Sequence, residues 1–277
     1  MNRGAAPACD PPRPILHGKS VRTKRSYTDN HMAPVMIYME EKFSLETLST
    51  EESLDLRAIG DKAWKAIVES CTAPELKLYY LKIRSLAGIE RLRRTVKLHV
   101  EYANKVEDLS PLYAMHWLES LTVYDFPRIR RLDGIEALEG LKELRLSGCR
   151  GSGDPPLKLE SVRPIASLRN LETLEITNLR LEDSDISFIA PSFPRLRSLR
   201  LSGKEFERAQ LAFLVKRLNA QLDEPIEGNW VMDYAFCKCG SKYQLFMGRR
   251  MGMLCPVCQE AKFKKLTEEW ERMMQEA

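Results

Sequence analysis

The middle of the chain repeats a pair of apolar residues, spaced two apart, about once every 23 residues. The pairs are Leu98 and Val100, Leu121 and Val123, Leu144 and Leu146, Leu174 and Ile176, and Leu199 and Leu201. One unit of this length cannot bury its apolar face alone, so successive units must stack into a solenoid. A solenoid builds an extended surface more readily than a reaction pocket, which favours binding over catalysis.

The spacing of core positions inside each unit also repeats. After Leu98 the next apolar positions follow at offsets 8, 11 and 14, and the same offsets hold after Leu121. After Leu144 the same spacing is found only if seven residues are treated as an insertion. The inserted stretch contains glycines and prolines. Because these residues favour loops, we expect an insertion at residues 150–156.

The segment LEGLKELRLSGC, residues 138–149, matches the L-x-x-L-x-L-x-x-N/C core of leucine-rich repeats. On these residues the chain resembles leucine-rich repeat proteins of the short class, with repeats of about 22 residues. The resemblance implies an α/β solenoid with a parallel β-sheet on its concave side. Cys149 stands at the Asn/Cys position, but no unit has asparagine there, and Phe126 and Lys204 occupy it in two units. In the family this residue bonds the neighbouring turn, so we expect less regular turns here.

Four of the seven cysteines form two close pairs near the C-terminus: Cys237, Cys239, Cys255 and Cys258. Four thiolates that arrive on two tight turns are what a tetrahedral zinc site requires. Two short strands are predicted between the pairs, around a turn at 248–250. Together these features resemble a zinc ribbon, although the first pair is C-x-C where the family has C-x-x-C. One structural zinc ion is the favoured interpretation, and a disulfide or a metal-free dithiol is the alternative.

Composition and pattern divide the rest of the chain. Residues 1–35 are basic and poor in large apolar groups, which predicts a disordered tail. Residues 36–74 have apolar residues at helical spacing, which predicts an N-terminal helical cap. The later segments are the repeats at 75–218 (about six), a connector at 219–236, the zinc-ribbon-like module at 237–260 and a C-terminal helix at 261–277. We expect Trp230 and Tyr234 to pack the connector onto the end of the solenoid.

The net charge of +4 belongs to the N-terminal tail, since the remaining residues balance 37 basic against 37 acidic groups. Because residues 36–277 carry no net charge, they do not indicate general binding to nucleic acids or membranes. No stretch reaches the roughly 18 apolar residues of a membrane helix, and the first residues lack the apolar core of a secretory signal. We therefore expect an intracellular, cytoplasmic protein. A transit peptide, or a natural start at Met32 or Met36, stays open for the tail.

Residues between the paired core positions should point to the concave side. Aromatic and arginine side chains most often anchor interfaces, and we expect Tyr79, His99 and Tyr124 to form an aromatic cluster. The predicted partner-binding residues are Tyr79, His99, Glu101, Thr122, Tyr124, Arg145, Glu175 and Arg200. The alternative, that these are ordinary solvated strand residues, stays open.

The chain has no nucleophile elbow, Walker loop, H-E-x-x-H pair or dinucleotide fingerprint. We therefore predict a non-enzymatic module that binds a protein partner and is a monomer on its own. The alternative is a nucleic-acid-associated factor that uses the zinc ribbon and the basic tail, because residues 228–277 carry eight basic and six acidic groups. The C-terminal helix has an apolar face, which indicates docking on the same chain or, less often, on a partner.

Overall fold

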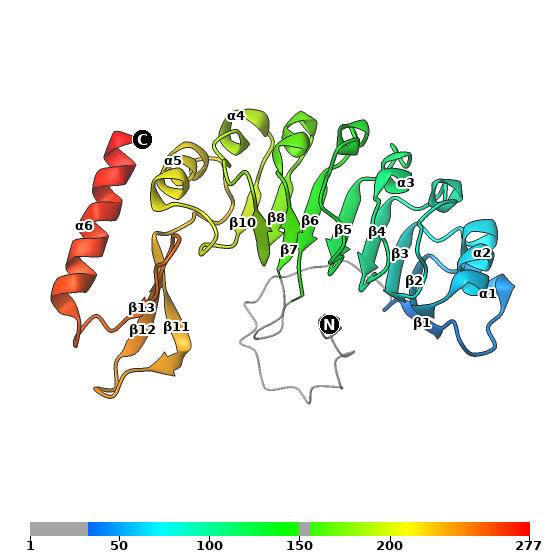
Figure 1. The fold of residues 1–277 in the computed structure, drawn as a ribbon, viewed down its shortest axis with the longest axis horizontal. Helices are drawn as coiled ribbons and strands as arrows, with labels where there is room; N and C mark the ends of the chain where they lie inside the picture. Colours follow the sequence, from blue (N-terminus) through cyan, green and yellow to red (C-terminus); the bar gives the residue numbers. More distant parts are fainter. Residues whose placement is uncertain (1–32, 150–155) are drawn as a thin grey trace, which may run out of the picture.

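The computed structural model describes residues 33–149 and 156–277 as an arc with strands on its inner side and short helices on its outer side (Figure 1). An eight-stranded parallel sheet lines the concave face in the order β1-β2-β3-β4-β5-β6-β8-β10. Each strand therefore pairs with the one from the preceding unit, as expected of stacked repeats. The fold is the α/β solenoid of leucine-rich repeats that the sequence predicts.

The elements of the solenoid are short. The strands of the concave sheet are β1 (Val35–Tyr38), β2 (Ser53–Ile59), β3 (Glu75–Leu81), β4 (Lys97–Glu101), β5 (Ser120–Tyr124), β6 (Glu143–Ser147), β8 (Thr173–Thr177) and β10 (Ser198–Leu201). The helices are α1 (Leu45–Thr50), α2 (Asp61–Ser70), α3 (Ser110–Tyr113), α4 (Ile189–Ser192) and α5 (Arg208–Leu218), with 3₁₀ turns η1 (Ile89–Arg91), η2 (Ile135–Ala137) and η3 (Arg163–Ser167). Of these described helices of the solenoid, α2 and α5 alone are longer than two turns.

The paired apolar residues stack in register across the sheet. Leu98 pairs with Leu76 on one side and with Leu121 on the other, and Leu121 pairs with Leu144. All four side chains are at most 2% exposed. Burial of each such leucine contributes about 1.5–3 kcal/mol, so the ladder is a large source of the solenoid's stability.

The N-terminal cap contains the expected helix, α2, in which Trp64 is buried and its indole N–H donates to the Ala87 carbonyl at 2.9 Å. However, the cap is not only helical. Residues 36–74 also supply β1 (whose first residue is Val35) and β2, and Leu54 and Leu56 of β2 pair with Leu76 and Leu78 of β3. The parallel sheet therefore begins at β1, two strands earlier than the expected repeats. Each of these two strands is followed by an α-helix rather than a 3₁₀ turn.

The turns that follow the strands are regular, which corrects the expectation drawn from the missing asparagine. The Asn/Cys position holds buried apolar residues instead, among them Leu81, Ala103 and Phe126. The residue before it has left-handed backbone in five units, with φ between 45° and 59°; these residues are Ala58, Tyr80, Tyr102, Asp125 and Asn178.

Backbone hydrogen bonds join these turns directly. The Tyr102 N–H donates to the Tyr124 carbonyl at 3.0 Å, and the Asp125 N–H donates to the Ser147 carbonyl at 2.9 Å. Bonds between successive turns and a stack of apolar side chains thus replace the asparagine ladder. Gly148 takes the equivalent place in the next unit, where a Cβ would lie 2.4 Å from the Leu157 nitrogen.

The expected insertion lies largely outside the described residues, which exclude 150–155. Directly after it, β7 (Leu157–Leu159) pairs in parallel with β9 (Leu179–Leu181) to form a separate two-stranded sheet. Most of the expected disordered tail, residues 1–32, is likewise outside the described part of the chain.

The chain ends in a three-stranded antiparallel sheet and a helix: β11 (Asn229–Phe236), β12 (Lys242–Phe246), β13 (Met253–Leu254) and α6 (Glu260–Glu276). The expected connector therefore stops at β11, which is a strand that the sequence analysis did not predict. The ring of Trp230 lies against the last repeat as expected, since a Cβ at Gly203 would be 3.5 Å from it, although 41% of the residue stays exposed. Tyr234 does not pack there, since it is 81% exposed.

Helix α6 docks on the last repeat through a buried arginine on α5. Arg208 is 7% exposed, donates to the Leu266 carbonyl at 2.9 Å and lies 3.3 Å from the Glu269 carboxylate. Trp270 of the apolar face of α6 also packs against the core of the same chain, although no residue of α6 is fully buried. None of the helices in the described part combines the length and apolarity that crossing a bilayer requires.

Candidate functional site

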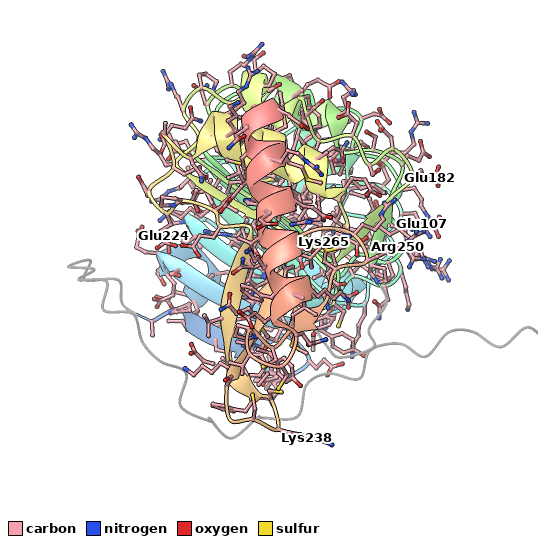
Figure 2. The ribbon with its side chains drawn as sticks, turned by 90° about the vertical axis from the view of Figure 1, so that its left-hand side faces the viewer. Glu107, Glu182, Glu224, Lys238, Arg250 and Lys265 are labelled. Carbon is pink, nitrogen blue, oxygen red and sulfur yellow. The ribbon has the colours of Figure 1, made fainter. Side chains whose placement is uncertain are left out.

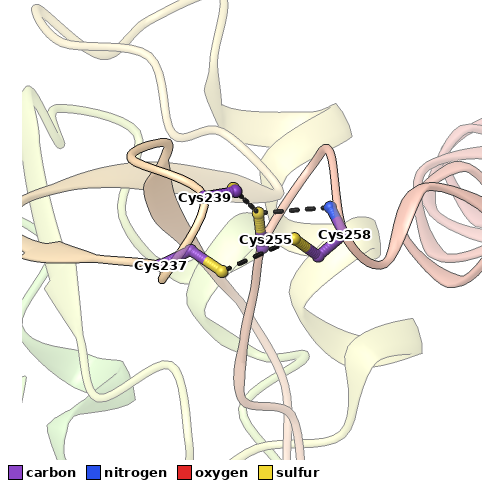
Figure 3. A group of neighbouring side chains, drawn as sticks. All are labelled: Cys237, Cys239, Cys255 and Cys258. Atoms are coloured by element: carbon purple, nitrogen blue, oxygen red, sulfur yellow. Dashed lines mark hydrogen bonds between the residues drawn. The ribbon is translucent and has the colours of Figure 1, made fainter.

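The four C-terminal cysteines converge on one point (Figure 3). Their sulfur atoms all lie within 4.8 Å of one another. The Sγ atoms of Cys237 and Cys258 are 3.7 Å apart, and those of Cys239 and Cys255 are 3.5 Å apart. A tetrahedral zinc ion with Zn–S bonds of about 2.3 Å places its sulfurs about 3.8 Å apart. A disulfide would need about 2.0 Å. The four thiols are therefore unbonded to one another and have the spacing of a metal site.

Each pair of cysteines is held by a tight turn. In the first turn the Cys237 N–H donates to the Ser241 carbonyl at 2.8 Å, and Gly240 has a φ of 88° that few other residues adopt. In the second turn the Cys258 N–H points at the Cys255 sulfur at 3.3 Å. The C-x-C spacing thus still delivers both sulfurs to the same side.

Hydrogen bonding favours thiolates in the first turn. The backbone N–H of Cys239 lowers the pKa of Cys237, and the hydroxyl of Ser241 lowers the pKa of Cys239 to about 6. Hydrogen bonds to Cys239 and Cys237 raise the pKa of Cys258 to about 12, since one proton is retained between crowded sulfurs. A bound cation removes that proton, because a coordinating thiol is deprotonated outright. The donor set therefore fits a soft divalent metal ion.

The candidate metal site rests on a small apolar core. Phe246 is 1% exposed and contacts Phe263 of α6 edge-to-face at 5.1 Å, and Leu254 is 5% exposed. The two turns are thus tied to α6 as well as to each other.

The predicted partner-binding residues lie on neighbouring strands of the concave sheet. His99, Thr122, Arg145, Glu175 and Arg200 form one column in direct register across β4, β5, β6, β8 and β10. A second column begins with Tyr79, Glu101 and Tyr124. A hollow of about 400 Å³ is lined by Ser147 together with six of the eight predicted residues, which are His99, Glu101, Thr122, Tyr124, Arg145 and Glu175.

A nearly buried carboxylate lies at each end of this hollow. The Glu101 carboxylate accepts from Lys77 Nζ and His99 Nε2, both at 3.0 Å. Burial alone would raise the pKa of Glu101, but these two hydrogen bonds lower it below its usual value. At the other end Glu175 lies 3.8 Å from Arg145 and 3.9 Å from Arg200. The ion pairs fix the shape and charge pattern of the concave face.

The aromatic cluster differs from the predicted one. Tyr79 contacts Tyr102 edge-to-face at 5.1 Å, and Tyr102 contacts Tyr124 in the same way at 5.7 Å. The His99 ring is instead hydrogen-bonded to the Glu101 carboxylate. Tyr124 is only 9% exposed. Burial raises the pKa of Tyr102 above its usual value. The sequence analysis missed Tyr102, although tyrosine recurs at the same place in the preceding unit as Tyr80.

Arg57 of β2 is a further residue of this face that the sequence analysis missed. Its guanidinium lies 4.9 Å from the centre of the Tyr79 ring and bonds the buried carboxylate of Asp55 at 2.7 Å. It was missed because the repeats were taken to begin at β3.

No protein-family model matches the sequence. Among solved structures, the chain is similar to internalin C2 of Listeria monocytogenes, with 20% identity and a TM-score of 0.42 over 55% of this chain and 61% of that one. It is also similar to an internalin (inlF) of the same organism, with 19% identity and a TM-score of 0.43 over 64% of this chain and 49% of that one. The chain thus spans less than two thirds of either. At this similarity neither internalin says what this chain binds, and the leucine-rich repeat fold rests on the strand order and register given above.

Proposed function

We propose that this chain is a non-enzymatic recognition module that binds a protein partner on its concave face and carries one structural zinc ion at its C-terminal end. The observation that carries the proposal is the hollow of about 400 Å³ over β4, β5, β6 and β8, lined by polar and aromatic side chains. Grooves that mix aromatic rings with arginine are typical of protein interfaces.

The concave side chains are ordered before any partner binds, which supports this function. Glu101 is fixed by Lys77 and His99, and Arg145 is held between Glu143 at 3.3 Å and Glu175. A preordered surface loses less side-chain entropy on binding. Arg145 and Arg200 keep 41% and 71% of their side-chain surface exposed, so both guanidiniums are available to a partner.

The metal has a structural role in this proposal. Four cysteine ligands close the coordination sphere of zinc and leave no open position for water, so the ion does no catalysis. It joins the turn after β11 to the turn before α6, and Arg208 joins α6 to the last repeat. Four reduced thiols also agree with an intracellular location.

The partner surface is tested by affinity capture from the native host followed by mass spectrometry. Wild-type chain is compared with the double variant Arg145→Glu and Arg200→Glu, and the matched control is Arg94→Glu and Arg128→Glu, two exposed arginines outside the concave columns. We expect one protein to be retained by wild type and control and lost from the concave variant.

Equal capture by all three proteins would refute the concave-face assignment. Capture that disappears after nuclease treatment would instead support a nucleic-acid-associated function. The thermal midpoints of the three proteins serve as the folding control.

A further inference from the structure

The ion pairs within the two concave columns share one orientation, in which the basic side chain lies outward and the carboxylate lies beneath it. At the N-terminal end the Asp55 side chain is 6% exposed, whereas Arg57, which pairs with it, is 25% exposed. The register of β2 and β3 places both residues in these columns. The next carboxylate, Glu101, is 14% exposed, whereas its partners Lys77 and His99 are 32% and 37% exposed. A molecule that approaches this half of the face therefore meets the basic side chains before the carboxylates.

The same orientation is more pronounced at the C-terminal end. The Glu175 side chain is 10% exposed, whereas Arg145 and Arg200 are 41% and 71% exposed. From β2 to β10 the two columns hold four Lys and Arg side chains and three carboxylates, a formal charge of +1 with His99 neutral. Because the carboxylates lie deeper than the cations, the potential above the face is more positive than this small excess suggests.

Arg200 has hydrogen-bonding capacity that the described part of the chain does not use. Glu175 lies in register between Arg145 and Arg200. The Arg200 guanidinium approaches the Glu175 carboxylate only to 3.9 Å, which is longer than a hydrogen bond, and it donates to no other acceptor among the described residues. Arg145 is held more firmly, since Glu143 lies 3.3 Å from it. An external carboxylate matches the fork of guanidinium donors and accepts two parallel bonds from it.

A hollow beside Arg200 has room for such a carboxylate. Its volume is about 480 Å³, and its walls include Arg145, Glu175, Arg197 and Arg200. Arg145 and Glu175 also line the hollow of about 400 Å³ over β4, β5, β6 and β8, so the two hollows adjoin at this pair. From β4 to β10 the concave strands span roughly 19 Å, which is the length of about six extended residues. One continuous segment of a partner therefore reaches both hollows.

We propose that the protein partner presents an acidic segment to the concave face, with one of its Asp or Glu carboxylates bound to Arg200 within reach of Arg145. This inference rests on the proposed concave-face function and adds the chemical class of the partner's contact surface. A basic segment would meet the outward cations before it reached the carboxylates beneath them. An acidic segment places its carboxylates in the positive layer, and such charge complementarity raises both specificity and the association rate.

A nucleic acid fits this face less well than an acidic protein segment. A phosphate chain carries a charge at every nucleotide, and its affinity comes from the number of phosphates that cations neutralise. The columns have an excess of one cation, and the hollow beside Arg200 is also lined by Asp223 and Glu224. These acidic groups repel a continuous phosphate chain, whereas a peptide has carboxylates on selected side chains alone.

The test is selection of random peptides of about twelve residues, displayed on phage, on the full, zinc-loaded chain; this is twice the length that the columns require. Peptides retained by wild type should be enriched in Asp and Glu relative to the unselected library. The variant Arg145→Glu and Arg200→Glu should lose this enrichment. In fluorescence anisotropy, a synthetic copy of an enriched peptide should bind this variant at least about tenfold more weakly than wild type.

Two controls separate charge recognition from loss of folding. The same peptide with Gln and Asn in place of Glu and Asp should bind wild type at least about tenfold more weakly, which needs no protein variant. The matched protein control, Arg94→Glu and Arg128→Glu, should retain wild-type affinity. Arg128 pairs with Glu107, which lies on the opposite flank of the arc from Glu224 at the hollow beside Arg200 (Figure 2).

Selection by wild type without enrichment of Asp and Glu, or with no peptide retained, would overturn the inference. Equal affinity of an acidic peptide for wild type and the charge-reversed variant would overturn it too, as would retention of single-stranded nucleic acid in preference to the peptides. The affinity capture proposed above distinguishes this failure from failure of the proposed function. A protein that wild type retains and the concave variant loses keeps the concave-face function even without an acidic contact surface, whereas equal capture removes both proposals.

Discussion

Replacing Phe126 by asparagine should destabilise the solenoid, even though it restores the residue type that leucine-rich repeats use at this position. Phe126 is 0% exposed and belongs to the stack of apolar side chains behind the turns. Loss of a buried aromatic ring costs about 3–5 kcal/mol. The new amide would add about 1–3 kcal/mol if it found no partner.

Two backbone N–H groups beside this position already have carbonyl acceptors, so they are not available to the oxygen of a new amide. The N–H of Ala103 already donates to the Asp125 carbonyl at 3.2 Å, and the Ile129 N–H already donates to the Phe126 carbonyl at 3.2 Å. We therefore expect the free energy of unfolding to fall by about 4–8 kcal/mol in Phe126→Asn. The companion variant Phe126→Leu keeps the site apolar and should lose no more than about 1.5 kcal/mol.

The assay is urea unfolding at 25 °C, followed by circular dichroism on the zinc-loaded chain. Both variants are compared with wild type at equal zinc occupancy, because loss of the metal would lower stability for a different reason. If Phe126→Asn proves as stable as wild type, an asparagine ladder can form in these turns. The claim that backbone bonds and apolar packing have replaced it would then be wrong.

Two further predictions concern the metal site and the concave face. Elemental analysis should return one zinc per chain for wild type and much less for Cys239→Ser. Cobalt(II) in place of zinc should give the absorption spectrum of a tetrahedral thiolate complex. A metal content near zero in wild type would refute the site. The pKa of Glu101 is lower in the folded chain than its value of about 4.3 in the unfolded chain. The ionised carboxylate therefore stabilises the fold above about pH 4.3, and this contribution is lost as the pH falls through the folded pKa. The difference in unfolding free energy between wild type and Glu101→Gln should therefore shrink between about pH 6 and pH 3, and a constant difference would contradict the ion pairs with Lys77 and His99.

The repeat architecture was predictable from the sequence, because burial of one leucine face imposes a period that can be counted. The register of the concave sheet followed from it, and the predicted pairing of Leu98 with Leu121 and of His99 with Thr122 is confirmed. The grouping of the four cysteines was also predictable, since two tight turns at either end of a hairpin bring their ligands together.

Which side chains are covered could not be predicted from the sequence, because it depends on contacts in the folded chain. Tyr124 was expected on the exposed face but is buried against Tyr102, since a left-handed residue after β4 brings the Tyr102 ring to the neighbouring column. Tyr234 was expected to be covered and is 81% exposed, since its segment pairs with β12, whereas the Trp230 ring does lie against Gly203 of the last repeat. Periodicity reports which face of an element is apolar, whereas the covering of that face depends on contacts between residues distant in the chain.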